Sequence, residues 1–170
     1  MNIKTFIRDI ENVPTHGVVF RDITPLLNDS EAIKFAEEAL LGLIGEHKID
    51  KVVGMESRGF FFAPMLASRL NAGFIPVRKP GKLPFKTIRQ DYDLEYGTDA
   101  LEIHADAIGK GDRVLVHDDV LATGGTANAT CKLIEKMGGK IVQCNFLLEL
   151  DFLNGKDKLM EYEVESLLHF

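Results

Sequence analysis

The stretch that most restricts the fold of this chain runs from Val114 to Thr126 and reads VLVHDDVLATGGT. It opens with an apolar run, Val114–Val116, of the kind found in strands that are buried on both faces. A loop of small and hydroxyl-bearing residues follows, and then a plausible helix from Ala127 to Ile134. A strand, a small-residue turn and a helix N-terminus together predict an anion site, because unpaired backbone N–H groups and the helix dipole converge there.

Two adjacent carboxylates, Asp118 and Asp119, stand directly before this loop. Acids at the end of a buried strand are costly unless a ligand uses them. Ribose 5-phosphate would suit both halves of the motif, since its hydroxyls donate to the carboxylates while its phosphate takes the loop amides. The alternative is a solvated turn that happens to carry two acids.

The rest of the chain alternates between the strand and helix patterns. The clearest helix runs from about Ser30 to His47, after capping candidates Asn28 to Ser30. Further helical patterns cover Phe60 to Leu70 and Ala127 to Met137, and they separate short apolar runs at Lys51–Met55, Phe74–Val77, Arg113–His117 and Lys140–Leu148. This alternation predicts an α/β fold with a mostly parallel sheet flanked by helices, in which ligands bind beyond the C-terminal ends of the strands.

Length, charge and cysteine content narrow the class of protein. A chain of 170 residues predicts one domain, residues 1–170. A formal net charge of −6 argues against a general nucleic-acid surface, and no uncharged stretch is long and apolar enough for a membrane span or a signal peptide. Two cysteines without CxxC spacing predict buried free thiols in a reducing cytoplasm. The motifs of P-loop proteins, dinucleotide-binding folds, serine hydrolases and zincins are absent.

The stretch VLVHDDVLATGGT closely resembles the diphosphoribosyl-binding signature of type I phosphoribosyltransferases, and most closely that of members acting on adenine. Four more segments match the family in order and at similar spacing: His16–Pro25 resembles its purine-side segment, Glu56–Phe60 its pyrophosphate loop, and Arg78–Pro84 with Tyr92–Gly97 its mobile catalytic loop. The sequence departs from the family at His117, where an apolar residue is usual, and at Val120, where leucine is commoner. Neither departure removes a ligand group.

The resemblance implies transfer of ribose 5-phosphate from phosphoribosyl pyrophosphate to adenine, forming AMP and pyrophosphate in purine salvage. It implies the type I phosphoribosyltransferase fold with a small N-terminal hood to which residues 1–27 contribute, a mobile catalytic loop at residues 78–100, and substrate-bound Mg²⁺ as cofactor. A cytoplasmic homodimer is expected, because the Arg78–Lys82 segment resembles one that completes the neighbouring active site.

The resemblance also implies roles for single residues. Asp118 and Asp119 hold the ribose hydroxyls as catalytic residues, and the 5-phosphate binds at Ala122, Thr123, Gly124, Gly125 and Thr126. Pyrophosphate binds at Ser57, Arg58, Arg78, Lys79 and Lys82, with a non-prolyl cis peptide between Glu56 and Ser57. The base lies among Val19, Phe20, Arg21 and Leu150. No side chain is assigned as a permanent metal ligand.

Glu95 is the expected catalytic proton donor or acceptor. The segment from Pro84 to Gly97 is polar and poorly periodic, which predicts a long loop or irregular hairpin acting as a lid. By resemblance this lid brings Glu95 to a ring nitrogen of the purine, while Tyr96 shapes the closed loop.

Two other functions stay open at this point. One is a related transferase for xanthine, hypoxanthine or guanine, since base choice rests on few contacts. The other is a regulator of purine synthesis that senses phosphoribosyl pyrophosphate while binding DNA. The second needs a DNA-reading module, whereas only about 27 residues precede the first long helix and the net charge is negative.

Overall fold

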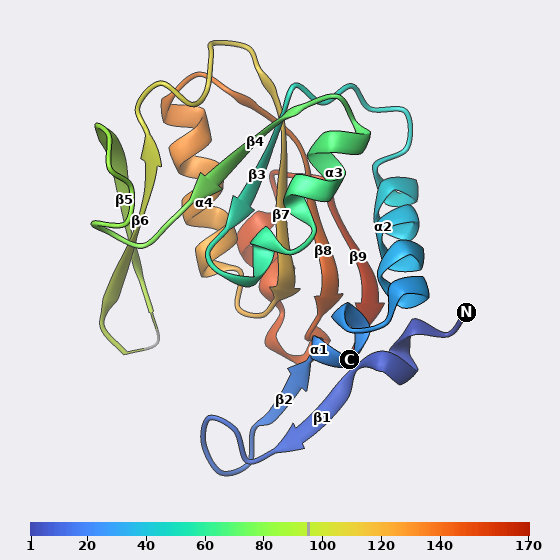
Figure 1. Ribbon diagram of the computed structural model, residues 1–170. Helices are drawn as coiled ribbons and strands as arrows, with labels where there is room; N and C mark the ends of the chain where they lie inside the picture. The colour runs from blue at the N-terminus through green and yellow to red at the C-terminus, as the bar shows by residue number, and fades with distance from the viewer. Residues whose placement is uncertain (95) are drawn as a thin grey trace. The chain divides into compact units, whose positions relative to one another are not determined.

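The computed structural model describes residues 1–94 and 96–170 (Figure 1). Its contacts divide it into two compact units, Met1–Ala39 and Leu40–Phe170. The first unit holds a short 3₁₀ helix, η1 (Ile3–Phe6), an antiparallel pair of strands, β1 (Arg8–Glu11) and β2 (Val19–Asp22), and the short helix α1 (Thr24–Leu27). The second unit holds everything from the end of α2 onward, including the stretch that predicts the anion site.

Helix α2 (Ser30–Ile44) begins where the capping residues predict. The Asp29 carboxylate caps it by accepting hydrogen bonds from the backbone N–H groups of Glu31 at 3.0 Å and Ala32 at 2.9 Å. The helix ends at Ile44, three residues before the expected His47, because Gly45 takes a left-handed φ of 63° that stops it.

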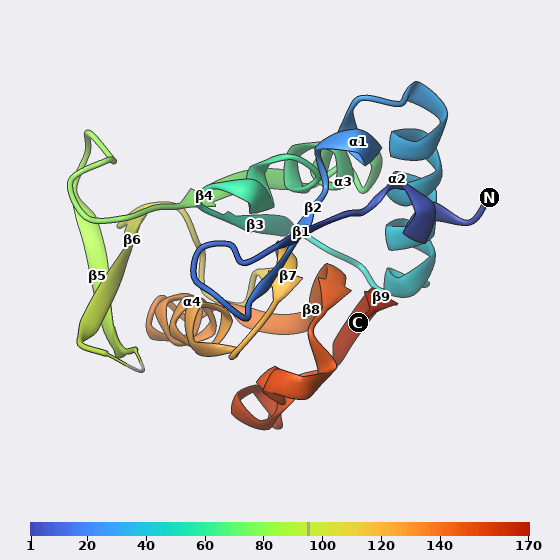
Figure 2. The same cartoon turned by 90° about the horizontal axis from the view of Figure 1, so that it is seen from below.

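The centre of the second unit is a five-stranded sheet. Its strands are β3 (Lys51–Met55), β4 (Gly73–Val77), β7 (Arg113–Leu121), β8 (Lys140–Glu149) and β9 (Val164–His169). They lie in the order β4-β3-β7-β8-β9, and every neighbouring pair is parallel. Figure 2 shows α3 (Ala63–Arg69) and α4 (Gly125–Lys136) on opposite faces of this sheet. The predicted α/β architecture is therefore confirmed.

The central strands of the sheet are buried because helices cover both of its faces. The apolar run Val114–Val116 of β7 is fully buried, as are Val52 and Val53 of β3 and Phe146 of β8 to within 1% of their surface. Strands covered on both faces favour continuous apolar runs over alternation, which is why these strands could be found from the sequence.

Two features differ from the expected elements, and a third decides between two expected alternatives. Strand β7 does not end at His117 but continues to Leu121, so that Asp118 pairs with Phe146 of β8 inside the ladder. Strand β9 has no predicted counterpart. The antiparallel pairing of β5 (Thr87–Asp93) with β6 (Thr98–His104) selects the expected hairpin over the open loop.

The strand order places the site. From β3 the chain continues to β4 on one side, whereas β7, β8 and β9 follow one another on the other side. The order of connection thus reverses between β3 and β7. In open parallel sheets a crevice forms beyond the C-terminal strand ends at such a reversal, and ligands bind there.

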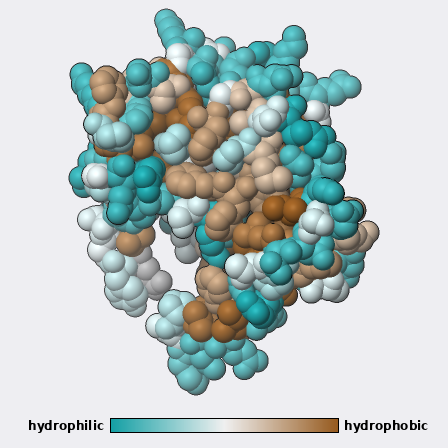
Figure 3. Space-filling view, viewed as in Figure 1, coloured by the Kyte–Doolittle hydropathy of each residue, from teal (hydrophilic) through white to brown (hydrophobic). Residues whose placement is uncertain are grey.

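The exposed surface is mixed in character. Figure 3 shows hydrophilic residues along the upper rim of the face in view and hydrophobic residues gathered nearer its middle. Among the described residues, no helix has the length and apolar character that crossing a bilayer requires.

Candidate active site

The acidic pair lies at the C-terminal end of β7, next to an arginine that follows β3. Arg58 opens the 3₁₀ helix η2 (Arg58–Phe60), and its Nε lies 3.0 Å from Oδ2 of Asp119. The Asp119 side chain is 4% exposed and that of Arg58 33%. These two groups, with Ser57 and Asp118, line a cavity of about 230 Å³. The sheet therefore brings together two predicted ligand sets that are 60 residues apart in the chain.

The surroundings of the acidic pair disfavour ionisation of its two carboxyl groups. Burial raises the pKa of Asp118 well above its ordinary value, and the neighbouring Asp119 carboxylate adds to this shift. Burial also raises the pKa of Asp119, although the Arg58 guanidinium opposes the change. Oδ1 of Asp118 accepts a 2.8 Å hydrogen bond from the backbone N–H of Asp119, which fixes its direction. A cation or hydroxyl donor at this point would relieve the repulsion between the two carboxylates.

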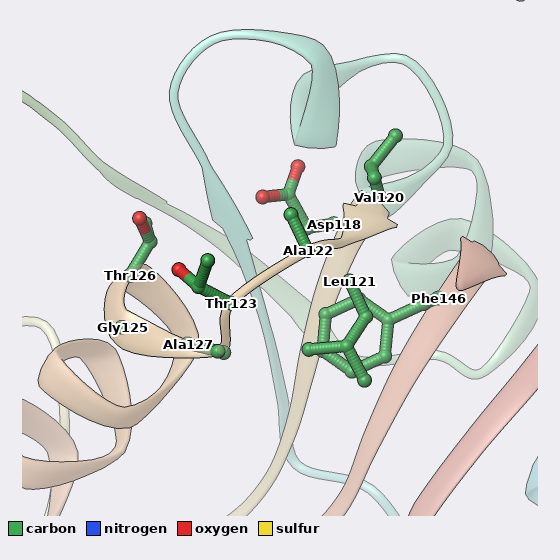
Figure 4. Close-up of a pocket in the computed structure, with 10 residues that line it drawn as sticks. Asp118, Val120, Leu121, Ala122, Thr123, Gly125, Thr126, Ala127 and Phe146 are labelled. Carbon is green, nitrogen blue, oxygen red and sulfur yellow. The ribbon is translucent and has the colours of Figure 1, made fainter. Parts of the chain in front are cut away.

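The predicted phosphate loop follows directly. Residues 122–126 line a small cavity of about 70 Å³ together with Asp118, Leu121 and Phe146. Figure 4 shows the Asp118 carboxylate and the Thr126 hydroxyl on one side of the loop, whereas Leu121 and Phe146 lie on the other side. Gly124 caps α4 with a left-handed φ of 78°, so the first N–H groups of the helix face the loop.

Gly59, for which the sequence predicts no role, packs against the backbone and side chain of the acidic pair. A Cβ on Gly59 would lie 3.0 Å from both Oδ1 of Asp118 and the backbone oxygen of His117. The loop after β3 therefore packs directly against the end of β7. Gly59 lies in the segment Glu56–Phe60 that resembles the pyrophosphate loop, but only the tertiary contact shows why a side chain is excluded there.

The segment after β3 has the expected cis peptide between Glu56 and Ser57. Beside it, Nη2 of Arg78 lies 3.1 Å from Oε1 of Glu56, and the backbone N–H of Lys79 donates to Oε2 of Glu56 at 2.8 Å. Burial opposes ionisation of Glu56, but these hydrogen bonds hold its pKa below the ordinary value. Glu56 thus anchors the start of the basic segment at the edge of the site.

The Lys79 side chain contacts one acid and one hydroxyl of the hairpin. Its Nζ forms an ion pair with Asp99 and donates to the Tyr92 hydroxyl at 3.2 Å. Burial alone would lower the pKa of Lys79, but its bonds with Asp99 and Tyr92 raise it above the ordinary value. The Tyr92 hydroxyl also lies 3.4 Å from Oγ1 of Thr126, so a chain of polar contacts joins Lys79 to the phosphate loop. Tyr92 and Asp99 lie within the expected catalytic loop, residues 78–100, but the sequence assigned neither a role of its own because their partners are distant along the chain.

His117 belongs to a buried network behind the acidic pair. Its Nδ1 lies 3.0 Å from Oδ1 of Asn145, whose Nδ2 donates to the backbone oxygen of Leu40 at 3.3 Å. Burial lowers the pKa of His117 to about 4, so the ring is neutral at pH 7. A histidine can replace an apolar residue here because Asn145 satisfies one ring nitrogen.

The remaining predicted site residues lie at the following places. Lys82 is exposed before the hairpin, and Tyr96 is 88% exposed at its tip. Leu150 follows β8, and its backbone N–H donates to the oxygen of Leu121 at 2.9 Å. Glu95 lies outside the described residues.

The predicted base-binding residues Val19, Phe20 and Arg21 are consecutive on β2 of the first unit. Phe20 is half-buried and Val19 is 39% exposed. Arg21 forms an ion pair with Asp9 across the two strands. Their contact with a base stays a prediction.

Comparison with known proteins gives a consistent result over the whole chain. A family model described as a phosphoribosyl transferase domain matches residues 25–165. The adenine phosphoribosyltransferase of Christiangramia forsetii is 64% identical, over 100% of this chain and 99% of that protein.

Solved structures agree. The adenine phosphoribosyltransferase from Rhodothermus marinus has a TM-score of 0.94 and 52% identity, covering 99% of this chain and 96% of that one. The Saccharomyces cerevisiae enzyme, in complex with an imino-altritol bisphosphate and adenine, has a TM-score of 0.92 and 40% identity, covering 98% and 96%.

Proposed function

This chain belongs to the phosphoribosyltransferase family, within it to the adenine phosphoribosyltransferases, and from this premise we propose that it transfers ribose 5-phosphate from phosphoribosyl pyrophosphate to adenine. The products are AMP and pyrophosphate, and the reaction is a step of purine salvage. The fold is that of the type I members of the family, with the parallel sheet described above.

One observation carries the assignment. The acidic pair, the phosphate loop and Arg58 meet at the reversal point of the sheet, where the Nε of Arg58 lies 3.0 Å from Asp119. A pentose that bears a phosphate at one end and a diphosphate at the other needs these three kinds of group in this order. Neutral donors bind the phosphate, acceptors bind the hydroxyls, and a guanidinium binds the diphosphate.

The proposed roles follow from this placement. Asp118 and Asp119 accept hydrogen bonds from the two ribose hydroxyls, and residues 122–126 bind the 5-phosphate through backbone N–H groups and the hydroxyls of Thr123 and Thr126. Ser57 and Arg58 bind the pyrophosphate, and Arg78, Lys79 and Lys82 serve the same group from the basic segment. Asp99 pairs with Lys79 and Glu56 pairs with Arg78, so pyrophosphate would compete with these acids.

The reaction breaks the bond between C1 of the ribose and the pyrophosphate oxygen, which keeps both electrons. A ring nitrogen of adenine forms the new bond to C1 and loses its proton. We propose that the Glu95 carboxylate accepts this proton. Positive charge develops on the ribosyl ring in between, and the carboxylates of Asp118 and Asp119 stabilise it electrostatically. Catalysis thus rests on positioning and charge.

Magnesium is the proposed cofactor, and the donor set fits it. Asp118 and Asp119 offer carboxylate oxygens of the kind that Mg²⁺ and its water shell prefer. Burial raises the pKa of both acids, and the charge of Asp119 raises that of Asp118 further, so a nearby cation would stabilise their ionised forms. The substrate and water would hold most of the ion, with the acidic pair ordering its water shell. When bound, Mg²⁺ neutralises charge on the departing diphosphate.

The base site and the assembly are also part of the proposal. Val19, Phe20 and Arg21 provide an aromatic face and main-chain groups for the purine, opposite Leu150. The enzyme works as a homodimer in the cytoplasm, where Cys131 and Cys144 stay free thiols. A fully active monomer in sedimentation experiments at assay concentration would contradict the dimer.

A panel of purine bases tests the function. The purified protein is mixed with phosphoribosyl pyrophosphate, Mg²⁺ and adenine, hypoxanthine, guanine or xanthine, and nucleotide formation is followed by chromatography. We expect AMP from adenine and much less nucleotide from the oxo-purines. Faster formation of IMP, GMP or XMP would reassign the base, and no nucleotide from any of the four would reject the proposal.

A further inference from the structure

A lysine from the C-terminal part of the chain lies beside the phosphate loop. Lys158 belongs to the 3₁₀ helix η4 (Gly155–Leu159), more than 30 residues after the loop. Its Nζ lies 3.8 Å from the position that a Cβ on Gly125 would take. It lines a cavity of about 360 Å³ together with Thr123, Gly125 and Thr126 of the loop.

The loop has no positive charge of its own. Residues 122–126 are two glycines, two threonines and an alanine, which offer only neutral donors. A phosphate monoester carries a charge of about −1.5 to −2 at pH 7. The charged side chains that β7 and β5 contribute to the lining of these cavities are acids, namely Asp118 in the smaller cavity and Asp93 in the larger one. A cation would strengthen the binding of a dianion by these neutral donors, and Lys158 is placed to supply one.

The backbone around Lys158 is fixed to the loop. A Cβ on Gly155 would lie 2.3 Å from the backbone oxygen of Ala122, and a Cβ on Gly124 would lie 2.3 Å from the backbone oxygen of Gly155. The two backbones therefore touch, with no room for side chains between them. On the other side of Lys158, Leu159 is 1% exposed and anchors the segment in the core. This packing sets the distance between the lysine and the loop.

We propose that Lys158 is a further ligand of the 5-phosphate, forming a charge-assisted hydrogen bond with it. The inference rests on the proposed function, since it takes residues 122–126 as the phosphate site. With the residues that the structure describes, Lys158 makes no hydrogen bond or ion pair that a phosphate would have to displace. It differs in this from Lys79, which Asp99 already holds.

The test uses ribose 5-phosphate as the probe and calorimetry as the readout, with the full-length protein. The variants are Lys158→Met, which keeps the apolar stem, and Lys158→Arg, which keeps the charge. Lys132→Met is the matched control, because Lys132 is an exposed lysine on α4 that lines a neighbouring cavity; Gly125 and Lys158 also line this cavity, but Thr123 and Thr126 do not. Unfolding temperatures of all variants are measured alongside.

Loss of a hydrogen bond to a charged group predicts a weakening of ribose 5-phosphate binding by about 10- to 100-fold in Lys158→Met. Lys158→Arg should recover most of the affinity, and Lys132→Met should bind like the wild type. Equal affinities in Lys158→Met and wild type would overturn the inference. It would also fall if Lys132→Met lost as much, or if the loss in Lys158→Met came with a lowered unfolding temperature and no recovery in Lys158→Arg.

This readout is separate from the transfer reaction. A protein that binds ribose 5-phosphate through Lys158 but makes no AMP would refute the proposed function and leave the lysine assigned. If the wild-type protein makes AMP but Lys158→Met binds ribose 5-phosphate as tightly as the wild type, the proposed function stands and the assignment of Lys158 is refuted.

Discussion

Substituting Gly155 by alanine adds one methyl group at the contact between η4 and the phosphate loop. The new Cβ would lie 2.3 Å from the backbone oxygen of Ala122 and 3.0 Å from Cδ1 of Leu121. The first of these neighbours is backbone, which cannot rotate away. Either the loop or η4 has to move until the Cβ reaches ordinary contact at 3.4 Å or more, a shift of about 1 Å.

The magnitude follows from that displacement. Overpacking of this kind costs roughly 1–3 kcal/mol of stability. Misplacing a binding group by about 1 Å lowers the rate by on the order of 10²-fold. Because Ala122 begins the phosphate loop, the loss should fall on kcat/KM for phosphoribosyl pyrophosphate, with a smaller effect on the KM for adenine.

Gly42 provides the matched control. It lies on α2, and a Cβ there would meet no atom within 4 Å. Gly42→Ala should therefore raise stability by about 0.5–1 kcal/mol, the usual gain in a helix, and leave the kinetics unchanged. Initial rates with varied phosphoribosyl pyrophosphate and denaturant unfolding measure both quantities. A Gly155→Ala enzyme with wild-type kcat/KM would refute the reasoning, because the loop would then tolerate the displacement.

Three further predictions concern single ionisable groups. His117 has a pKa of about 4 in the folded protein instead of its ordinary 6.5. As the pH falls from 6.5 to 4, this histidine therefore becomes protonated in the unfolded chain while it stays neutral in the folded protein. Stability is therefore lost in that window, by about 3 kcal/mol from this group, and a His117→Gln variant should show a flatter profile in denaturant unfolding between pH 7 and 4; parallel profiles would contradict the assignment. Asp118→Asn and Asp119→Asn should each lower kcat by on the order of 10²–10³ while the far-ultraviolet circular dichroism stays unchanged, because each removes charge where positive charge develops. Wild-type turnover in the double variant would exclude the pair from the mechanism. Glu95→Gln should lower single-turnover AMP formation by roughly 10²–10⁴ with little change in phosphoribosyl pyrophosphate binding, and Asp93→Asn is its control. Loss of activity in the control alone would reassign the proton-transfer group.

The structure bears out the elements whose signals are local. The buried strands β3, β7 and β8 are continuous apolar runs, and α2 begins at a capping residue. Strand β9 was missed because it lies at the edge of the sheet, where its burial is partial and its pattern is weak. The end of β7 was placed too early, because two carboxylates inside a strand ladder contradict the usual cost of burying acids.

The acidic pair and the phosphate loop could be predicted from the sequence, because those groups are neighbours along the chain and their spacing is set by covalent geometry. The distant groups that join them become visible only once the chain is folded. The contact between Arg58 and Asp119 depends on β3 and β7 lying side by side, and the contact of Gly155 with Ala122 depends on the chain returning after β8. Nothing in a window of ten or fifteen residues specifies these contacts, because burial energy is shared by the whole sheet and not by any one segment.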